Sequence, residues 1–322
     1  MALHPAVAAC RLAVRHELGL PEGATVLVAC SGGPDSTALL SATVFEGHKA
    51  GLRVIGVTVD HGLQEGSADH AALVVRRMAA MGVDETASAR VTVSAAGLGV
   101  EAAARRARYD VLEQMREHFG ADRVLLGHTR DDQAETVLLG LTRGSGARSL
   151  AGMRRSFDHY ARPLLEVSRD DTVTACQVEG LAVWSDPHND DPGFTRVRVR
   201  QRVLPVLEDE LGPGIAETLA RTADQVRDDV ELLDAMALAA YEEMADLEVA
   251  ELGATHPALR ARVLRLAALD AGAIDAELFH VHVTRLVALV VGEIRGEVQL
   301  PGHVTAHLSD GHLRFRSTRV EA

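Results

Sequence analysis

A short apolar run from Val26 to Cys30 ends in the polar sequence SGGPDS, which spans residues 31–36. The apolar run predicts a buried strand, and helical spacing resumes after Ser36, so the polar cluster is the turn between them. A Gly-rich turn between a strand and a helix binds phosphate when its backbone N–H groups converge on the anion. The loop is not the one that ends in Gly-Lys-Ser/Thr, because the only lysine of the chain is Lys49.

The carboxylate in this loop needs a cation. Asp35 would be repelled by bound phosphates unless a cation lies between them, so we infer Mg²⁺ at Asp35. The alternative is that Asp35 is a helix N-cap and Pro34 an ordinary turn residue. The residues expected to bind the phosphates are Ser31, Gly32, Gly33, Pro34, Asp35 and Ser36.

A second cluster, LLGHTRDDQAET, follows another apolar run. If a helix begins near Thr129, Asp132 and Glu135 lie on one face, and His128 lies at the end of the strand. Two carboxylates beside an imidazole can hold a cationic amine, take its proton, or do both. The alternative is that acids in a first helical turn only complement the helix dipole.

One arginine falls on an apolar helix face. A single stripe of the segment EAAARRARYDVLEQMREHF contains Ala104, Arg108, Val111, Leu112, Met115 and Phe119. A guanidinium on that face requires an anionic partner, either a structural carboxylate or a substrate phosphate. Arg106 points to the opposite side, where we expect it to be solvated.

The elements that must position these residues alternate between strands and helices. The expected strands cover residues 25–30, 53–60, 90–94 and 123–128, and the expected helices cover residues 36–46, 68–82, 101–119 and 131–141. This alternation predicts an α/β fold with a doubly wound parallel sheet. Ligands of such sheets bind at the carboxyl ends of the strands, which is where both polar clusters fall.

The second half of the chain has a different pattern. Turns and polar loops are expected from about residue 150 to 210, and long helices follow at 216–249, 257–271 and 276–291. The tail alternates around Asp310 and Gly311, which predicts a β-hairpin. We therefore expect a catalytic domain over residues 1–212 and a smaller, mainly helical domain over residues 213–322.

Composition restricts the class of protein. The 322 residues are 47% hydrophobic with a mean hydropathy of +0.04, which is typical of a globular protein and not of a membrane protein. The first twenty residues are interrupted by Arg11 and Arg15, so we predict an amphipathic helix, no signal peptide and a cytoplasmic location. Net charge −13 argues against indiscriminate binding of polyanions, although two Arg-rich segments, LTRGSGARSLAGMRR and FTRVRVRQRVLP, are candidate phosphate contacts.

Cysteine usage supports neither disulfides nor a zinc site. Cys10, Cys30 and Cys176 are widely spaced and contain no CxxC pair, so we interpret them as small buried apolar residues. The single tryptophan, Trp184, is interpreted as a packing residue rather than a platform for a base.

Taken in order, several motifs resemble the tRNA(Ile)-lysidine synthetase family, a member of the N-type ATP pyrophosphatase (PP-loop) group. They are SGGPDS, VDHGLQ, EAAARRARYDVL, LLGHTRDDQAETVLLGLTRGSGARSLAGM, ARPLL and WSDPHNDDPGFTRVRVRQRVLP, and they cover about residues 25–205. The resemblance implies an adenine nucleotide alpha hydrolase-like sheet.

The resemblance also implies a two-step ligation. ATP adenylates the C2 oxygen of the wobble cytidine of an isoleucine tRNA with a CAU anticodon, and free lysine then displaces AMP to give lysidine. Asp35 would bind Mg²⁺, and Arg108 would neutralise developing charge. Asp132 and Glu135 would bind the lysine ammonium, while His128 or a carboxylate assists the proton transfer.

By the same resemblance, tRNA contacts are expected from Arg143, Arg148, Arg196 and Arg200. The C-terminal domain would grip the acceptor arm, and a homodimer is a reasonable hypothesis. Two positions depart from the family pattern: Gln64 stands where an arginine is usual, and Val197 where an asparagine is usual.

Three other functions compete with this interpretation. A tRNA thiolation enzyme of the same loop group relies on paired cysteines or an iron–sulfur cluster, for which the cysteine spacing is unsuitable. A GMP-synthetase-like amidotransferase needs a glutaminase domain, for which no residues remain. A non-catalytic nucleotide sensor would keep SGGPDS but would not need His128, Asp132 and Glu135 or the Arg-rich segments.

Overall fold

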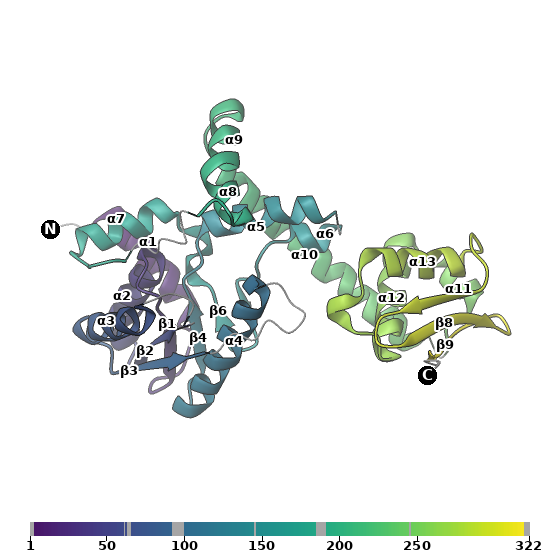
Figure 1. Cartoon of the computed structure of the whole chain (residues 1–322), viewed down its shortest axis with the longest axis horizontal. Helices are drawn as coiled ribbons and strands as arrows, with labels where there is room; N and C mark the ends of the chain where they lie inside the picture. The colour runs from purple at the N-terminus through teal and green to yellow at the C-terminus, as the bar shows by residue number, and fades with distance from the viewer. Residues whose placement is uncertain are drawn as a thin grey trace. The chain divides into compact units, whose positions relative to one another are not determined.

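The chain folds around a six-stranded, mainly parallel sheet, and a smaller antiparallel sheet lies near its C-terminus (Figure 1). The computed structural model describes residues 3–60, 62, 66–91, 100–144, 146–184, 191–244 and 246–318, and the side chains of residues 100–105 and 143 lie outside this description. Two compact units are present. The first comprises Met1–Leu139 and Gly152–Thr222, and the second comprises Gly140–Ala151 and Ala223–Ala322.

The large sheet has the order β3-β2-β1-β4-β6-β5. Its strands are β1 (Thr25–Ala29), β2 (Arg53–Asp60), β3 (Glu85–Arg90), β4 (Arg123–Leu126), β5 (Ser156–Phe157) and β6 (Tyr160–Ala161). All pairs are parallel except β5 with β6. Ala29 is in register with Val57 on one side and with Leu126 on the other, so the carboxyl ends of β1 and β4 lie together.

The strand expected at residues 90–94 is wrong in position. β3 ends at Arg90, and residues 92–94 lie outside the described part of the chain. β3 is an edge strand of the sequence ETASAR whose side chains are half-buried or exposed, so it lacks the apolar run used to predict strands. The Asp84 carboxylate fixes its start by accepting a hydrogen bond of 2.7 Å from the Val54 N–H.

Helices cover both faces of this sheet, because successive side chains of β1 belong to different cores. Val26 and Val28 belong to a core with α1 (Pro5–Glu17), α2 (Pro34–Lys49), α3 (Ser67–Ala80) and α7 (Arg169–Val178). Leu27 belongs to a second core, on the opposite face, with Leu112 of α4 (Val100–Phe119). The chain therefore buries both sides of β1, as its uninterrupted apolar sequence predicts.

The region expected to be loops contains more helix than predicted. After α5 (Arg130–Arg143), the first unit contains the 3₁₀ turn Pro163–Glu166, α7, α8 (Thr195–Arg198), the π-helical segment Val199–Val203 and α9 (Leu204–Leu211). Ser168 caps α7 by accepting a hydrogen bond of 3.0 Å from the Asp171 N–H. α7 and α8 are short and have polar first turns, so they give little apolar periodicity, which explains why they were missed.

The second unit surrounds its own core, which includes the fully buried Leu252, Leu264 and Leu286. Its elements are α6 (Ala147–Leu150), most of α10 (Ile215–Glu243), α11 (Val249–Ala254), α12 (Pro257–Asp270), α13 (His280–Val290), β7 (Glu297–Leu300), β8 (Val304–Ser309) and β9 (His312–Ser317). The predicted hairpin is confirmed: Asp310 and Gly311 have φ of 52° and 81° between β8 and β9. β7 extends it to three strands.

The expected boundary between residues 212 and 213 lies just before α10, which begins at Ile215, and the units divide within this helix, after Thr222. A continuous helix of 29 residues carries no compositional mark at the point where its contacts change. Among the described residues, no helix is long and apolar enough to cross a membrane.

Truncation of the α4 core contact tests this packing. Leu112 is 0% exposed, so we expect Leu112→Ala to lower the free energy of unfolding by about 2–5 kcal/mol through lost burial and a residual cavity. Leu12→Ala is the control, because Leu12 is 49% exposed and should cost less than about 1 kcal/mol. Urea denaturation followed by circular dichroism measures both, and equal losses would contradict the assignment of α4 to the core.

Candidate active site

The loop after β1 is held by its last residue. The Ser36 hydroxyl accepts a hydrogen bond of 3.1 Å from the Ser31 N–H and lies 3.1 Å from the carbonyl of Gly33, to which it donates. Gly32 has φ of +86°, and a Cβ there would lie 2.8 Å from the side chain of Val74. The loop therefore requires glycine at this position.

The first turn of α2 starts at this loop. Gly33 is the N-cap and Pro34 is the first helical residue, so the alternative that Asp35 caps the helix is wrong. Gly127, directly after β4, approaches the same turn so closely that a Cβ would lie 3.0 Å from the Ser36 nitrogen and Cα. The loops that follow β1 and β4 are therefore in contact, with no room for a side chain at Gly127.

A cavity of about 440 Å³ opens at the carboxyl ends of β1, β2 and β4. Its apolar wall includes Ala29, Val57, Val59, Leu112 and Leu126. Its polar wall includes Ser31, Ser36, Asp60, His70, Arg108, His128 and Trp184. An apolar wall with a few convergent polar groups is typical of a site for a small molecule.

Arg108 reaches this cavity from α4. The predicted stripe is confirmed for the described side chains, since Leu112 is buried and Val111, Met115 and Phe119 are half-buried, whereas Arg106 is exposed. The half-buried Arg108 side chain lines the cavity.

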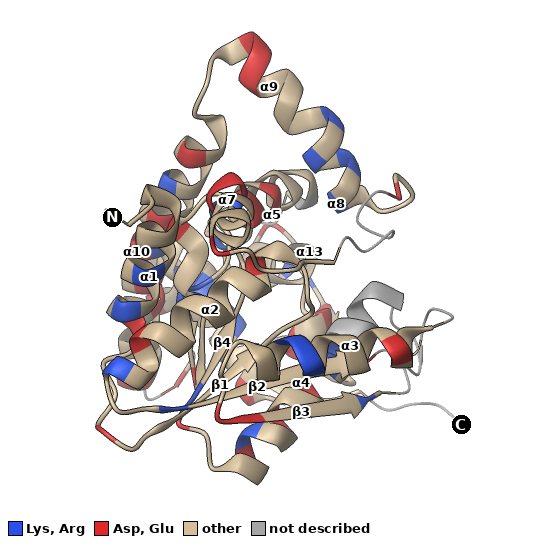
Figure 2. Ribbon diagram, turned by 90° about the vertical axis from the view of Figure 1, so that its left-hand side faces the viewer, with Lys and Arg blue, Asp and Glu red and all other residues tan. Residues whose placement is uncertain are grey.

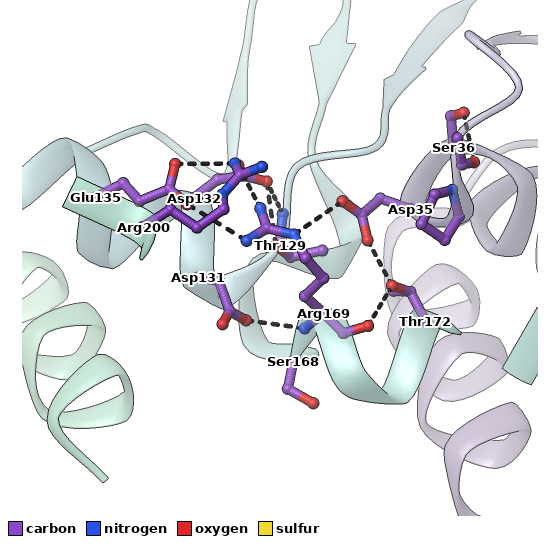
Figure 3. A network of polar contacts seen from close by, with 12 residues as sticks. Asp35, Ser36, Thr129, Asp131, Asp132, Glu135, Ser168, Arg169, Thr172 and Arg200 are labelled. Carbon is purple, nitrogen blue, oxygen red and sulfur yellow. Dashed lines mark hydrogen bonds and ion pairs between the residues drawn. The ribbon is translucent and has the colours of Figure 1, made fainter. Parts of the chain in front are cut away.

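Asp132 and Glu135 are buried at the start of α5, with exposures of 7% and 0%. One Asp132 oxygen, Oδ2, accepts hydrogen bonds from the Thr129 N–H (2.9 Å) and the Thr129 hydroxyl (3.1 Å). Its other oxygen, Oδ1, lies 2.8 Å from Nη2 of Arg169 (Figure 3). Asp132 thus stabilises the start of the helix, as the alternative interpretation expects, while its other oxygen pairs with a guanidinium of the chain; its binding of an amine stays a prediction.

Arginines from three later positions surround these carboxylates. Nε of Arg200 lies 2.7 Å from Oε1 of Glu135, and its Nη2 lies 3.1 Å from Oε2. Nη1 of Arg169 lies 3.3 Å from Glu135 Oε1, and Nε of Arg196 lies 3.8 Å from Glu135 Oε2. The buried carboxylate pair is thus neutralised by guanidinium groups of the chain itself.

Asp35 belongs to the same charge network and is not among the residues that line the cavity. Its carboxylate accepts a hydrogen bond from the Thr172 hydroxyl and lies 3.5 Å from Nε of Arg169. Burial raises the pKa of Asp35 above its usual value, despite Thr172 and Arg169. Burial also acts to raise the pKa of Asp132, but Arg169, His128 and the Thr129 N–H outweigh it and hold that pKa below its usual value.

The Arg-rich segments contribute inside the site as well as at the surface. Figure 2 shows basic residues along α8. Arg196 and Arg200, both predicted to contact tRNA, lie against Glu135, and Arg148 pairs with Asp234 at 2.8 Å within the second unit. The side chain of Arg143 lies outside the described residues, so these tRNA contacts stay predictions.

The two departures from the family pattern differ in what the structure says of them. Val197 is buried, so its side chain packs in the protein interior. Gln64 lies outside the described residues.

Sequence reasoning missed Arg169, Thr172 and His70 as site residues. The start of α7 could have been predicted, because Ser168 and Asp171 form a helix-capping motif on either side of Arg169. Nothing in the sequence, however, indicates that this helix begins beside Asp35 and Asp132.

His70 and Trp184 form one wall of the cavity. Their ring centroids are 3.7 Å apart, and the His70 Nε2 lies 3.1 Å from the Ser31 carbonyl oxygen. The backbone N–H of Trp184 donates a hydrogen bond of 2.8 Å to the Gly32 carbonyl. Trp184 therefore packs against the loop, as predicted, and also lines the cavity.

The fold and the loop define an ATP-binding α/β protein of the PP-loop class, and the family model for the PP-loop domain matches residues 11–207. The chain belongs to the tRNA(Ile)-lysidine synthase family of ligases. It is 48% identical over 98% of its length to tRNA(Ile)-lysidine synthase of Streptomyces coelicolor, of which the match covers 99%. It is 52% identical over 96% of its length to the enzyme of Thermobifida fusca, of which the match covers 97%.

A solved structure with the same fold is the U34-tRNA thiolase NcsA from Methanococcus maripaludis with its [4Fe-4S] cluster. The two share 18% identity with a TM-score of 0.56, covering 69% of this chain and 80% of that one, which shows a common fold alone. All three cysteines are buried, as predicted, and burial raises the thiol pKa of Cys10 and of Cys176 to about 12. Such thiols are poor nucleophiles.

The opposite pKa shifts of Asp35 and Asp132 predict opposite effects of amide substitution. The ionised form of Asp132 is favoured by folding, so Asp132→Asn should lower the free energy of unfolding at pH 7 by about 1–3 kcal/mol. Ionised Asp35 is disfavoured by burial, so Asp35→Asn should leave stability unchanged or raise it by up to about 1 kcal/mol.

The pH dependence has a defined sign. The folded pKa of Asp132 lies below the unfolded one, so its contribution is present above the unfolded pKa of about 4 and is lost as the pH falls below it. The difference in the free energy of unfolding between the wild type and Asp132→Asn, measured by urea denaturation, should therefore become smaller in acid. If Asp35→Asn lowered the free energy of unfolding at pH 7 as much as Asp132→Asn does, this account would be contradicted.

Proposed function

We propose that the protein joins free lysine to C2 of the wobble cytidine of an isoleucine tRNA with a CAU anticodon. In the first step the C2 oxygen attacks the α-phosphorus of ATP and pyrophosphate leaves. In the second step the side-chain amine of lysine attacks C2, and the C2 oxygen leaves with AMP. Membership of the lysidine synthase family supports this reaction, and the arrangement of the site supports its two halves.

The observation that carries the proposal is the contact between the two loops. Because Gly127 packs on Ser36, the cavity in which the nucleotide would bind lies beside the loop that leads from β4 to the buried carboxylate pair. His128 lines the cavity, and Asp132 lies one helical turn further along the same segment. A phosphate donor and an amine nucleophile held in these two places would react with one base placed between them.

ATP binding divides between the two walls of the cavity. The apolar wall, with Val57 and Leu126, suits the adenine ring, and the Ser31 and Ser36 hydroxyls suit the phosphates. The first turn of α2 adds backbone N–H groups and the positive end of the helix dipole. Arg108 would stabilise the charge that develops on the α-phosphate and the leaving pyrophosphate.

A magnesium ion fits the donor set at the loop. Mg²⁺ at phosphate sites is held by one or two carboxylates together with phosphate and water oxygens. Asp35 is the carboxylate beside Ser36, and its Oδ2 contacts Arg169 only at 3.5 Å, so this oxygen retains lone pairs for a metal. Asp35 would hold the ion, which would neutralise charge on the ATP phosphates.

Lysine would bind through its ammonium at Asp132 and Glu135. The lowered pKa of Asp132 keeps this carboxylate ionised at neutral pH, which suits it to hold a cation and makes it a weak base. Imidazoles exchange protons near neutral pH, and His128 faces the cavity, so we assign to His128 the proton that the ammonium loses before attack.

Arginines would position the tRNA, with Arg143 and Arg148 on one segment and Arg196 and Arg200 on the other. Phosphate contacts of this kind orient a nucleic acid without reading its sequence. The second unit would hold the acceptor arm. A homodimer and a cytoplasmic location complete the proposal.

The ligation is tested with purified protein, Mg²⁺, ATP, radiolabelled lysine and a CAU isoleucine tRNA transcript. We expect ATP-dependent label in acid-precipitated RNA, and its loss by at least about a hundredfold in Asp132→Ala. Asp110→Ala is the control, because Asp110 is an exposed acid on α4. Binding of nucleotide without any label from the wild type would contradict the proposal and favour thiolation or a sensor.

Arg108 is tested in the first step alone. With lysine omitted, tRNA-dependent release of pyrophosphate reports adenylation, and we expect Arg108→Ala to slow it by about 10²–10³-fold through lost charge stabilisation. Arg106→Ala, two residues earlier and exposed, should remain within about threefold of the wild type. Equal rates for the two variants would remove Arg108 from the reaction.

A further inference from the structure

The side chain of Arg169 contacts acids on two separate elements of the first unit. Its Nε lies 3.5 Å from Asp35 on α2, while its Nη2 lies 2.8 Å from Asp132 on α5 (Figure 3). Its Nη1 lies 3.3 Å from Glu135. All three guanidinium nitrogens are thus used, each toward a different carboxylate, and the side chain is only 20% exposed.

The backbone of Arg169 is tied to the same two elements. Its N–H donates a hydrogen bond of 2.8 Å to Asp131 Oδ2, next to Asp132 in α5. Its carbonyl accepts a hydrogen bond of 2.7 Å from the Thr172 hydroxyl, which also contacts Asp35. The first turn of α7 therefore connects the phosphate loop with the carboxylate pair through both side chain and backbone.

This arrangement has an electrostatic consequence for ligand binding. Arg169 is shared between Asp35, which lies beside the phosphate loop, and the pair that binds a cation. When an ammonium neutralises Asp132 and Glu135, these carboxylates attract Arg169 less. Its positive charge then becomes available to phosphates bound beside the loop.

We propose that Arg169 is a positioning residue that couples the two substrate sites, so that lysine and ATP each strengthen the binding of the other. The inference rests on the proposed function, because it takes Asp132 and Glu135 as the lysine site. The coupling is reciprocal, and couplings of this kind change affinity by about 5–150-fold. Arg200 also holds Asp132 and Glu135, at 3.4 and 2.7 Å, so the pair keeps a cation when Arg169 is removed.

The experiment measures the affinity of α,β-methylene-ATP by calorimetry, in the presence and absence of saturating L-lysine. In the wild type we expect lysine to tighten nucleotide binding by about fivefold or more. In Arg169→Gln the ratio of the affinities with and without lysine should fall below about twofold. A merely structural role would weaken binding of the analogue equally with and without lysine, and would leave the ratio unchanged.

Two further variants make the result decisive. Arg11→Gln is the matched control, because Arg11 forms a comparably buried ion pair with Glu179 at 2.7 Å, away from the cavity, and should keep the wild-type ratio. Arg169→Lys retains the charge, but one ammonium cannot reach three carboxylates, so this variant should also lose the coupling. If Arg169→Gln fails to fold, the affinity ratio of Arg169→Lys tests the inference in its place.

The possible outcomes separate the two proposals. The inference is overturned if the Arg169 variants keep the wild-type ratio, or if a wild type that forms lysidine shows no coupling. Absence of lysidine formation by the wild type would instead overturn the proposed function.

Discussion

The parallel pairing of β1 with both β2 and β4 is the constraint on which the site depends. Ala29 is level with Val57 and Leu126, so the chain leaves the sheet at neighbouring points after β1 and β4. The connection from β1 continues to β2 on one side, while β4 lies on the other, and a crevice forms where connections diverge in this way. Gly127 then allows the loop after β4 to touch the first turn of α2.

The site also requires that the charges of its buried carboxylates be balanced. Carboxylates without partners would be costly at exposures as low as that of Glu135, which is 0%, and guanidinium groups from α7 and from the segment after α8 supply the partners. The balance is uneven, since it favours ionised Asp132 and disfavours ionised Asp35. Neighbouring carboxylates whose pKa values are shifted in opposite directions are expected at functional sites.

The parts of the site that could be predicted from the sequence are local. The phosphate loop follows from a strand, a glycine pair and a helix start, and Arg108 stands out because it interrupts an apolar stripe of α4. Arg169 could not be predicted in this way, because its partners Asp35 and Asp132 are more than thirty residues away and meet it only through the packing of α7. The edge strand β3 was misplaced for a related reason, since an edge needs no continuous apolar run.

The transfer of oxygen in the reaction tests the central claim most directly. The claim is that ATP activates the C2 oxygen of cytidine before the amine held near Asp132 attacks. A CAU isoleucine tRNA carrying ¹⁸O at C2 of the wobble cytidine is incubated with the protein, Mg²⁺, ATP and lysine, and the AMP is analysed by mass spectrometry. The account predicts that the heavy oxygen appears in AMP in step with lysidine. Lysidine formed together with unlabelled AMP would contradict it.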